Sequence, residues 1–277
     1  MSQAPPDAAA PGVRVWTVRY LAHNGLPRTA HVALPADLGP GNNPPLPLVI
    51  SPHGRGLTGT ANLRFWGDLP ARGRFALISP DGHGRVLPLH SWGWEGQIAD
   101  LANMQYVAKA TLPWLRITPH AVYAMGGSMG GQETLLLLAG HRRLLAGAAS
   151  FDAPTDLARR YRDFPRIAGG RHLQELARRE VGGTPQSHPG AYARRSPIAR
   201  ARAIAFSSVP LQLYWSVADE VVLDQSHHSA QLFRRIKALN PRAPVTAFSG
   251  SWTHSGGMPA LLPGALRRFG LLPAEQV

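Results

Sequence analysis

The stretch that decides the fold is Tyr123-Ala-Met-Gly-Gly-Ser128-Met-Gly-Gly131. An apolar run over residues 120–125 leads into a serine flanked by glycines, and residues 132–140 (QETLLLLAG) have the composition of a helix. A strand, a sharp turn and a helix in this order form a nucleophile elbow, which presents a reactive serine at the end of a strand. We therefore expect the Ser128 hydroxyl to face a substrate.

Gly126 and Gly130, two residues before and after the serine, complete the G-x-S-x-G pattern. An elbow forces its serine into a strained backbone conformation, and side chains at the two flanking positions would collide with the neighbouring strand and helix. The pentapeptide also arises by chance in a chain with 29 glycines. Its position between a strand and a helix is therefore what makes it informative.

Length and composition predict one α/β domain with a small insertion. The chain has 277 residues; we expect residues 1–12 to form a disordered tail and residues 13–277 a single domain. The tail lacks a basic start and an apolar segment, and no apolar run reaches the ~18 residues of a membrane span. We expect a soluble, cytoplasmic protein without a membrane partner, and leave open secretion after removal of a leader.

Charge and cysteine content narrow the function classes. Cysteine is absent, which excludes disulfides, a cysteine nucleophile and thiolate metal sites. The formal net charge is +13, but arginine is spread along an Ala-, Gly- and Pro-rich chain, as GC-rich codon usage produces, so we expect no nucleic-acid partner. His227 and His228 are adjacent on an expected helix and face different directions, which makes them a poor chelate, so we expect no metal. We also expect no cofactor.

Strand and helix patterns alternate along the chain. Strands are expected at residues 13–20, 29–34, 46–51, 75–79, 120–125, 145–151, 209–216 and 245–249, and helices at 61–72, 98–115, 132–140, 224–239 and 259–269. This alternation predicts a mostly parallel, doubly wound sheet with an antiparallel N-terminal edge. Ligands of such sheets bind at the carboxyl ends of the strands.

Residues 156–204 differ in composition from the rest, with eleven arginines and broken helical patches. We expect this segment to form an insertion or cap over the sheet. The simpler interpretation of its arginines is a solvated surface. The functional alternative is a lid that favours anionic or polar substrates.

Two loops after expected strands carry candidate site residues. Pro52-His53-Gly54-Arg55-Gly56 follows the strand at 46–51, and its glycines allow main-chain N–H groups to converge on one point, as an oxyanion site requires. A plain turn with a structural histidine is the alternative. Trp92 and Trp94 lie in the loop 86–96, where they form the apolar wall of a pocket or pack a long loop onto the domain.

A serine nucleophile needs a base, and the base needs an orienting carboxylate. Asp219 follows the strand at 209–216 and His254 follows the strand at 245–249, in the chain order Ser, Asp, His. Asp219 could instead cap a turn, with Glu220 or Asp224 taking its place. His254 could instead be a packed loop histidine.

The motifs with a family resemblance are His53-Gly54, Gly126-Gly-Ser128-Met-Gly130, Asp219-x-x-Val222 and His254. They resemble the serine hydrolases of the α/β-hydrolase superfamily. Within it, the sequence is similar to compact esterases and to the catalytic domain of prolyl-oligopeptidase-type peptidases, as the weaker motif Arg195-Ser196-Pro197-Ile198 also indicates. The resemblance spans residues 13–271 and departs at Arg55, where many esterases carry a further glycine.

The resemblance implies an α/β-hydrolase fold and a carboxylesterase that acts on a small-molecule ester through an acyl-enzyme. The implied roles are Ser128 as nucleophile, His254 as base, Asp219 as orienting acid, the backbone N–H groups of Met129 and of Arg55 or Gly54 as oxyanion hole, and His53, Trp92, Trp94 and Trp252 as substrate pocket. The alternatives are a small peptidase or acyl-peptide hydrolase and an inactive binding scaffold. The oligomeric state stays open.

Overall fold

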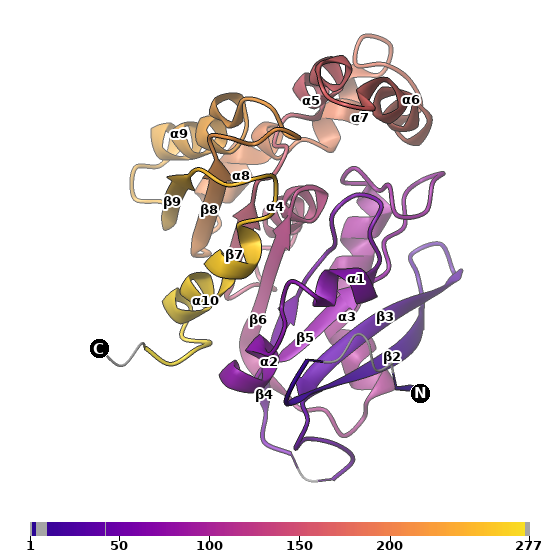
Figure 1. Ribbon diagram of the computed structural model, residues 1–277, viewed down its shortest axis with the longest axis vertical. Coiled ribbons are helices and arrows are strands. Elements are labelled where there is room, and N and C mark those ends of the chain that lie inside the picture. The colour runs from indigo at the N-terminus through magenta and orange to yellow at the C-terminus, as the bar shows by residue number, and fades with distance from the viewer. Residues whose placement is uncertain (1, 4–9, 42, 275–277) are drawn as a thin grey trace.

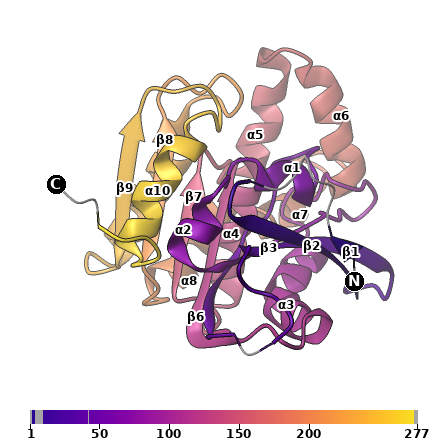
Figure 2. The same cartoon turned by 60° about the horizontal axis from the view of Figure 1, so that its bottom comes forward.

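The structure is a computed structural model that describes residues 2–3, 10–41 and 43–274 (Figure 1). Its strands form one nine-stranded sheet in the order β1-β2-β3-β5-β4-β6-β7-β8-β9. Pairing is antiparallel from β1 to β5 and parallel from β5 to β9, as the sequence predicts for a doubly wound sheet with an antiparallel N-terminal edge. Figure 2 shows β1 and β2 at one edge of the sheet and β9 at the other. The strands are β1 (Ser2–Gln3), β2 (Val13–Leu21), β3 (Pro27–Pro35), β4 (Leu46–Ile50), β5 (Ala76–Pro80), β6 (Ile117–Gly127), β7 (Gly147–Phe151), β8 (Leu211–Ser216) and β9 (Val245–Gly250).

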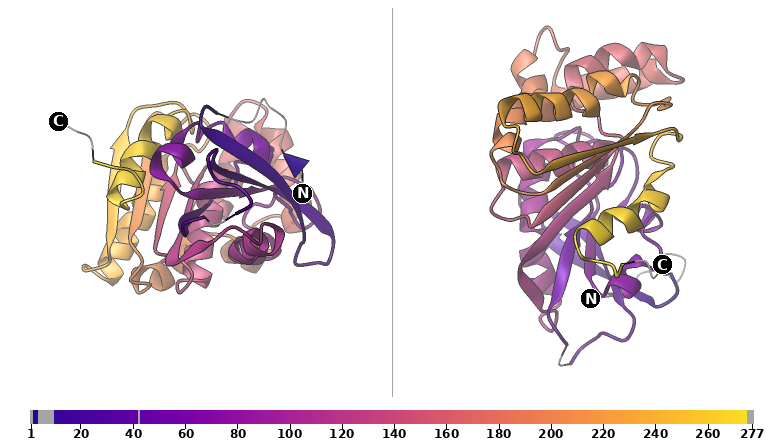
Figure 3. Two further views of the ribbon diagram at one scale, coloured as in Figure 1. Left: turned by 90° about the horizontal axis from the view of Figure 1, so that it is seen from below. Right: turned by 90° about the vertical axis from the view of Figure 1, so that its left-hand side faces the viewer.

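Helices cover both faces of the sheet, because successive strand residues point to opposite faces and both sets are apolar. On β4, Leu48 and Ile50 belong to the core under one group of helices and Val49 belongs to the core under the other. The first group is α3 (Glu95–Thr111), α4 (Met129–Gly140), α8 (Ala201–Ala205) and α9 (Ser229–Leu239), and the second is α1 (Gly59–Leu63), α2 (Leu69–Gly73) and α10 (Met258–Arg268). Figure 3 shows the yellow helix α10 on one face of the sheet.

The segment 156–204 builds a third, smaller core beyond the sheet. It contains α5 (Leu157–Asp163), η2 (Phe164–Arg166), α6 (Gly170–Val181), α7 (Pro189–Arg194) and η3 (Pro197–Arg200), and it ends in α8. Leu157, Phe164, Leu173 and Tyr192 pack there against Trp92 from the loop before α3. In Figure 1 this helical layer lies at the top of the molecule, beyond the strands.

Three expected helices differ from the observed ones. The helix expected at 61–72 is two short helices, α1 and α2, because Gly67 has a left-handed φ of 49° and Pro70 opens the second helix. The helix expected at 98–115 begins at Glu95 and ends at Thr111, two residues before Pro113. The helix expected at 224–239 is divided into η4 (Gln225–His227) and α9.

The tail expected at 1–12 falls in part on residues 1 and 4–9, which lie outside the described residues. Within that tail, Ser2–Gln3 pairs with β2 as strand β1. Among the described residues, no helix combines the length and the apolar character needed to cross a membrane.

Candidate active site

Strand β6 ends in a sharp turn at Ser128, from which helix α4 begins. Ser128 has φ 56° and ψ −125°, a conformation that costs a non-glycine residue about 1–3 kcal/mol. Two hydrogen bonds fix this backbone: the Ser128 N–H donates to the carbonyl of Phe151 on β7 (2.8 Å), and the Gln132 N–H donates to the carbonyl of Ser128 (3.0 Å). The serine side chain lies half-buried in the wall of a cavity. The local geometry is that of a nucleophile elbow.

The glycines of the elbow are required by close contacts. A Cβ atom on Gly126 would lie 2.7 Å from the carbonyl oxygen of Gly130, and one on Gly130 would overlap the carbonyl oxygen of Pro52. The collisions expected from the sequence are therefore present. A Cβ atom on Gly54 would lie 3.8 Å from the Ser128 Cβ atom, so the loop after β4 runs directly beside the serine.

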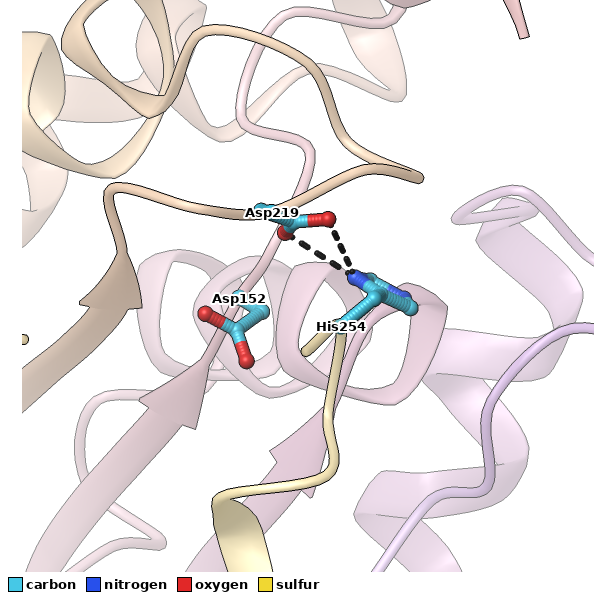
Figure 4. Close-up of side chains that lie close together, drawn as sticks. All are labelled: Asp152, Asp219 and His254. Carbon is cyan, nitrogen blue, oxygen red and sulfur yellow. Dashed lines mark hydrogen bonds and ion pairs between the residues drawn. The ribbon is translucent and has the colours of Figure 1, made fainter. Parts of the chain in front are cut away.

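A histidine and a carboxylate face each other across the loops that follow β9 and β8. The Nδ1 atom of His254 lies 2.9 Å from both carboxylate oxygens of Asp219 (Figure 4). The Asp219 carboxylate also accepts hydrogen bonds from the N–H groups of Val221 (2.9 Å) and Val222 (2.8 Å) and from the side-chain amide of Gln225 (3.1 Å). Because Nδ1 donates to the carboxylate, the lone pair of Nε2 is free to accept a proton.

The surroundings of Asp219 keep it ionised. Its side chain is buried, which by itself raises the pKa of a carboxyl group. The hydrogen bond and charge of His254, with the donors of Val221 and Gln225, outweigh that effect and hold the pKa of Asp219 below its ordinary value. A charged carboxylate at this position stabilises a positive imidazole.

The two other acids that the sequence offers for this role lie elsewhere. The carboxylate of Glu220 accepts from the backbone N–H of His254 (3.2 Å). Asp224 pairs with Arg159 (3.2 Å) and with His227 (2.6 Å). Of these three carboxylates, the one at the His254 ring is that of Asp219.

Asp152, a residue that the sequence analysis did not single out, lies beside this pair. It follows β7, is fully buried, and accepts from the N–H groups of Ser216 (2.8 Å) and Ser255 (3.0 Å) and from the indole of Trp252 (2.9 Å). Burial raises the pKa of Asp152, and the negative charge of Asp219 raises it further. Its bonds join the end of β8 to the loop that carries His254, so Asp152 positions the histidine. An aspartate directly after an apolar strand is the only signal in the sequence that could have found it.

Asp152, Asp219 and His254 also bring their ligand atoms within 4.8 Å of one another, close enough for a metal ion. Both carboxylates already accept several N–H groups, and the imidazole Nδ1 is the donor to Asp219. A cation would have to replace these hydrogen bonds. The donor set therefore fits an acid–base pair better than a metal centre.

A cavity of about 260 Å³ opens in front of the serine. Among the residues that line it are Ser128, His254, Met129, Gly54, Arg55 and Trp92, which the sequence analysis proposed, and Arg160, which it did not. Trp92 packs edge-on against Phe164 and is 3% exposed. The expected site residues from four separate loops thus meet at one cavity.

Three residues expected in the substrate pocket have other positions. His53 is 1% exposed; it accepts from the Gly82 N–H (2.7 Å) and its Nδ1 lies 2.7 Å from the Gly54 carbonyl, so it supports the loop beside the serine from behind. Trp94 stacks under the guanidinium of Arg195 at 5.0 Å, and the Trp252 indole is bound to Asp152. In each case a specific partner holds the ring away from the cavity lining, which these three residues do not join.

Solved structures similar to this chain share its fold. The chain is similar to acylaminoacyl peptidase from Pyrococcus horikoshii, with a TM-score of 0.70 and 15% identity, over 96% of this chain and 43% of that chain. It is also similar to prolyl oligopeptidase B from Galerina marginata (TM-score 0.66, 13% identity, 97% of this chain and 37% of that chain) and to an esterase from Rhizomucor miehei (TM-score 0.68, 13% identity, 94% and 85%).

This chain therefore spans less than half the length of the two peptidases and most of the length of the esterase. No family model and no curated protein matches the sequence. The structural similarity confirms the α/β-hydrolase fold that the sequence predicts.

Proposed function

We propose that this protein is a serine hydrolase that cleaves a carboxylic ester through an acyl-enzyme. The observation that carries the proposal is the 2.9 Å contact between His254 Nδ1 and Asp219, with His254 and Ser128 lining one cavity. The α/β-hydrolase fold and its similarity to esterases and peptidases agree with this reaction class. The substrate is a small-molecule ester.

In the first half-reaction, the Ser128 hydroxyl attacks the ester carbonyl carbon and His254 Nε2 takes its proton. Asp219 stabilises the imidazolium that forms. The tetrahedral intermediate then expels the alcohol, which takes the proton from His254, and the acyl group stays on the serine oxygen. The Nδ1–Asp219 bond keeps the ring in the tautomer that this step needs.

In this proposal, main-chain N–H groups near the serine bind the oxyanion. Met129 is the first residue of α4, so its N–H has no partner within the helix and lies at the positive end of the helix dipole. The second donor is the N–H of Arg55 or Gly54, in the loop that runs beside the serine. Each such donor is worth about 3 kcal/mol of transition-state stabilisation.

In the second half-reaction, water attacks the acyl-enzyme. His254 Nε2 removes a proton from the water, and the collapsing intermediate returns that proton to the Ser128 oxygen. The carboxylic acid leaves and the free serine is restored. The chain's own residues supply every proton transfer in this cycle.

A peptidase is the second candidate, and the similarity to acylaminoacyl peptidase and prolyl oligopeptidase favours it. A peptidase that holds a peptide amino terminus needs a carboxylate for the ammonium group. The charged side chains that line the cavity are instead the cations Arg55 and Arg160, besides the catalytic histidine. This argues against an aminopeptidase; an N-acylated peptide has no ammonium group, so cleavage of an acylated anilide decides between that substrate and the ester.

Steady-state hydrolysis of 4-nitrophenyl acetate, butyrate and octanoate, together with acetyl-alanine 4-nitroanilide, tests the proposal. We expect ester turnover that Ser128→Ala abolishes, while circular dichroism stays unchanged. Anilide cleavage without ester turnover would favour the peptidase. A folded protein that cleaves none of them would leave the binding scaffold as the better interpretation.

A further inference from the structure

Arg160, a cation in the cavity wall, has no ion-pair partner among the described residues. Arg160, on α5, is 3% exposed and lines the cavity with Ser128 and His254. Its Nη1 atom is buried and makes no hydrogen bond with the described part of the chain. The contact that holds the side chain is with the Phe164 ring, 4.5 Å below the guanidinium. A buried cation of this kind costs free energy unless something pairs with it.

The nearby carboxylates are committed to other groups. Asp219 and Asp163 act on Arg160 only through space. Asp219 is held by His254 and by three further donors, and Asp163 pairs with Arg159 (3.1 Å) and Arg166 (3.2 Å). Burial lowers the pKa of Arg160 to about 10, so the guanidinium keeps its proton at neutral pH. A positive charge is therefore present in the cavity during turnover.

Two other residues that line the same cavity also have donors without partners in the described chain. The Trp92 indole nitrogen and the Ser255 hydroxyl are buried and have no hydrogen-bond partner among residues 2–3, 10–41 and 43–274. Arg55, a half-buried cation, lines the same cavity, and burial lowers its pKa as well. Buried donors without partners cost about 1–3 kcal/mol each, so a site with several of them matches a ligand that brings acceptors.

We propose that the substrate carries a carboxylate besides its ester group, and that Arg160 binds this carboxylate, with Arg55 contributing charge and the Trp92 indole a hydrogen bond. The proposal rests on the proposed esterase function and adds the class of ester. A guanidinium fork matches the two oxygens of a carboxylate. The carboxylate belongs to the acyl part or to the alcohol part of the ester, and the two give different results in the test below.

Paired esters that differ only in the charge of one group test the proposal. On the acyl side the pair is 4-nitrophenyl hydrogen glutarate and 4-nitrophenyl methyl glutarate; on the alcohol side it is 4-acetoxybenzoate and its methyl ester. Ser128→Ala supplies the background rate, which a neighbouring carboxylate raises. For one pair we expect the wild-type kcat/KM to favour the acid at least about tenfold, since hydrogen bonds to charged groups contribute about 1.5–3 kcal/mol.

Substitutions of Arg160 test whether this residue causes the preference for the acid over the methyl ester. We expect Arg160→Met to lower the acid-to-methyl-ester ratio about 10- to 100-fold, mainly through KM, and Arg160→Lys to restore part of it. Arg162→Met is the matched control: Arg162 lies on the same helix, is exposed, and its loss changes the net charge equally, so the ratio should stay at the wild-type value.

The outcomes are distinct. Equal kcat/KM for acid and methyl ester in both pairs, in wild-type protein that does hydrolyse them, would overturn the carboxylate site and leave the esterase intact. A preference that survives Arg160→Met would also overturn it. Failure of folded wild-type protein to hydrolyse any of the four esters would instead refute the esterase itself. The wild-type comparison needs no variant and stays decisive if Arg160→Met does not fold.

Discussion

Arg195 and Arg160 are equally buried, at 3% exposure, and only Arg195 is fully engaged. The Arg195 guanidinium donates to the carbonyls of Ser91 (2.8 Å) and Glu180 (3.2 Å) and lies 3.7 Å from the Glu180 carboxylate. The Arg160 guanidinium lies on the active-site cavity with a phenyl ring as its contact. The first arginine joins the cap to the domain, and the second is left for a ligand.

The same contrast recurs in two tryptophans. The indole of Trp252 donates to Asp152, which in turn holds the loop of His254. Trp92 lines the cavity, and its indole nitrogen is buried without a partner in the described ranges. In both pairs, the side chain that joins two parts of the fold has its hydrogen bonds satisfied, and the side chain of the cavity-lining residue does not.

The largest effect on kcat is expected for Asp219, whose carboxylate has its hydrogen bonds satisfied. Asp219→Asn should lower kcat about 10³- to 10⁴-fold, because an amide both fails to stabilise the imidazolium and favours the wrong histidine tautomer. Glu220→Gln is the matched control and should change kcat less than about fivefold, because Glu220 touches the backbone of His254 and not its ring. Steady-state kinetics on 4-nitrophenyl butyrate measures both. Equal losses in the two variants would mean that Asp219 has no special role.

The two arginines should differ in stability. Arg195→Met should lower the free energy of unfolding by about 3–5 kcal/mol, since it leaves the buried Glu180 carboxylate without its cation. Arg160→Met removes no ion pair and should cost less than about 1.5 kcal/mol. Urea denaturation followed by tryptophan fluorescence compares the two. Similar losses would show that Arg160 is as structural as Arg195.

One buried glutamate extends the comparison to pH. Glu133, on α4, has a buried carboxyl oxygen without a partner in the described ranges, and burial raises its pKa to about 8. The folded protein therefore favours the protonated, neutral form of Glu133. The contribution of Glu133 to the free energy of unfolding is fully present below the unfolded pKa near 4.5 and is lost as pH rises to about 8. Glu133→Gln should thus gain stability relative to wild type by about 1.4 kcal/mol per pH unit in that window. Denaturation at pH 5, 6 and 7 measures it, and a difference independent of pH would contradict the assignment.

The smallest effect is expected for the tryptophans. Trp252→Phe removes a hydrogen bond to a buried carboxylate. It should lower the free energy of unfolding by about 2 kcal/mol more than the smaller ring alone would. Trp92→Phe removes the same N–H without breaking a bond, so its cost should be limited to packing. Thermal unfolding of the two variants isolates this difference. A larger loss for Trp92→Phe would reverse the division between the two regions.

The sequence predicted what local patterns determine. The elbow is predicted by glycines at positions where any side chain would collide with the backbone. Ser128, Asp219 and His254 each follow a strand that the sequence pattern predicts. Because parallel strands end at one edge of the sheet, strand order alone brings these three loops together.

The sequence did not predict which polar groups find partners. Asp152 receives its donors from residues 64 to 103 positions away, and no local pattern encodes those bonds. The sequence does not distinguish Arg160 from the other ten arginines in residues 156–204. The packing of α5 places Arg160 on the cavity. His53, Trp94 and Trp252 look like pocket residues by position in the chain, and their hydrogen-bond and ring partners hold them elsewhere.

The most direct test of the central claim is labelling with a fluorophosphonate probe, followed by peptide mass mapping. The account predicts a single adduct on Ser128, absent in Ser128→Ala and strongly slowed in Asp219→Asn, because the probe reports the activated serine itself. Ser255, which lines the same cavity, should stay unlabelled. A label on Ser255, or no label on folded wild-type protein, would contradict the assignment of Ser128 as the nucleophile.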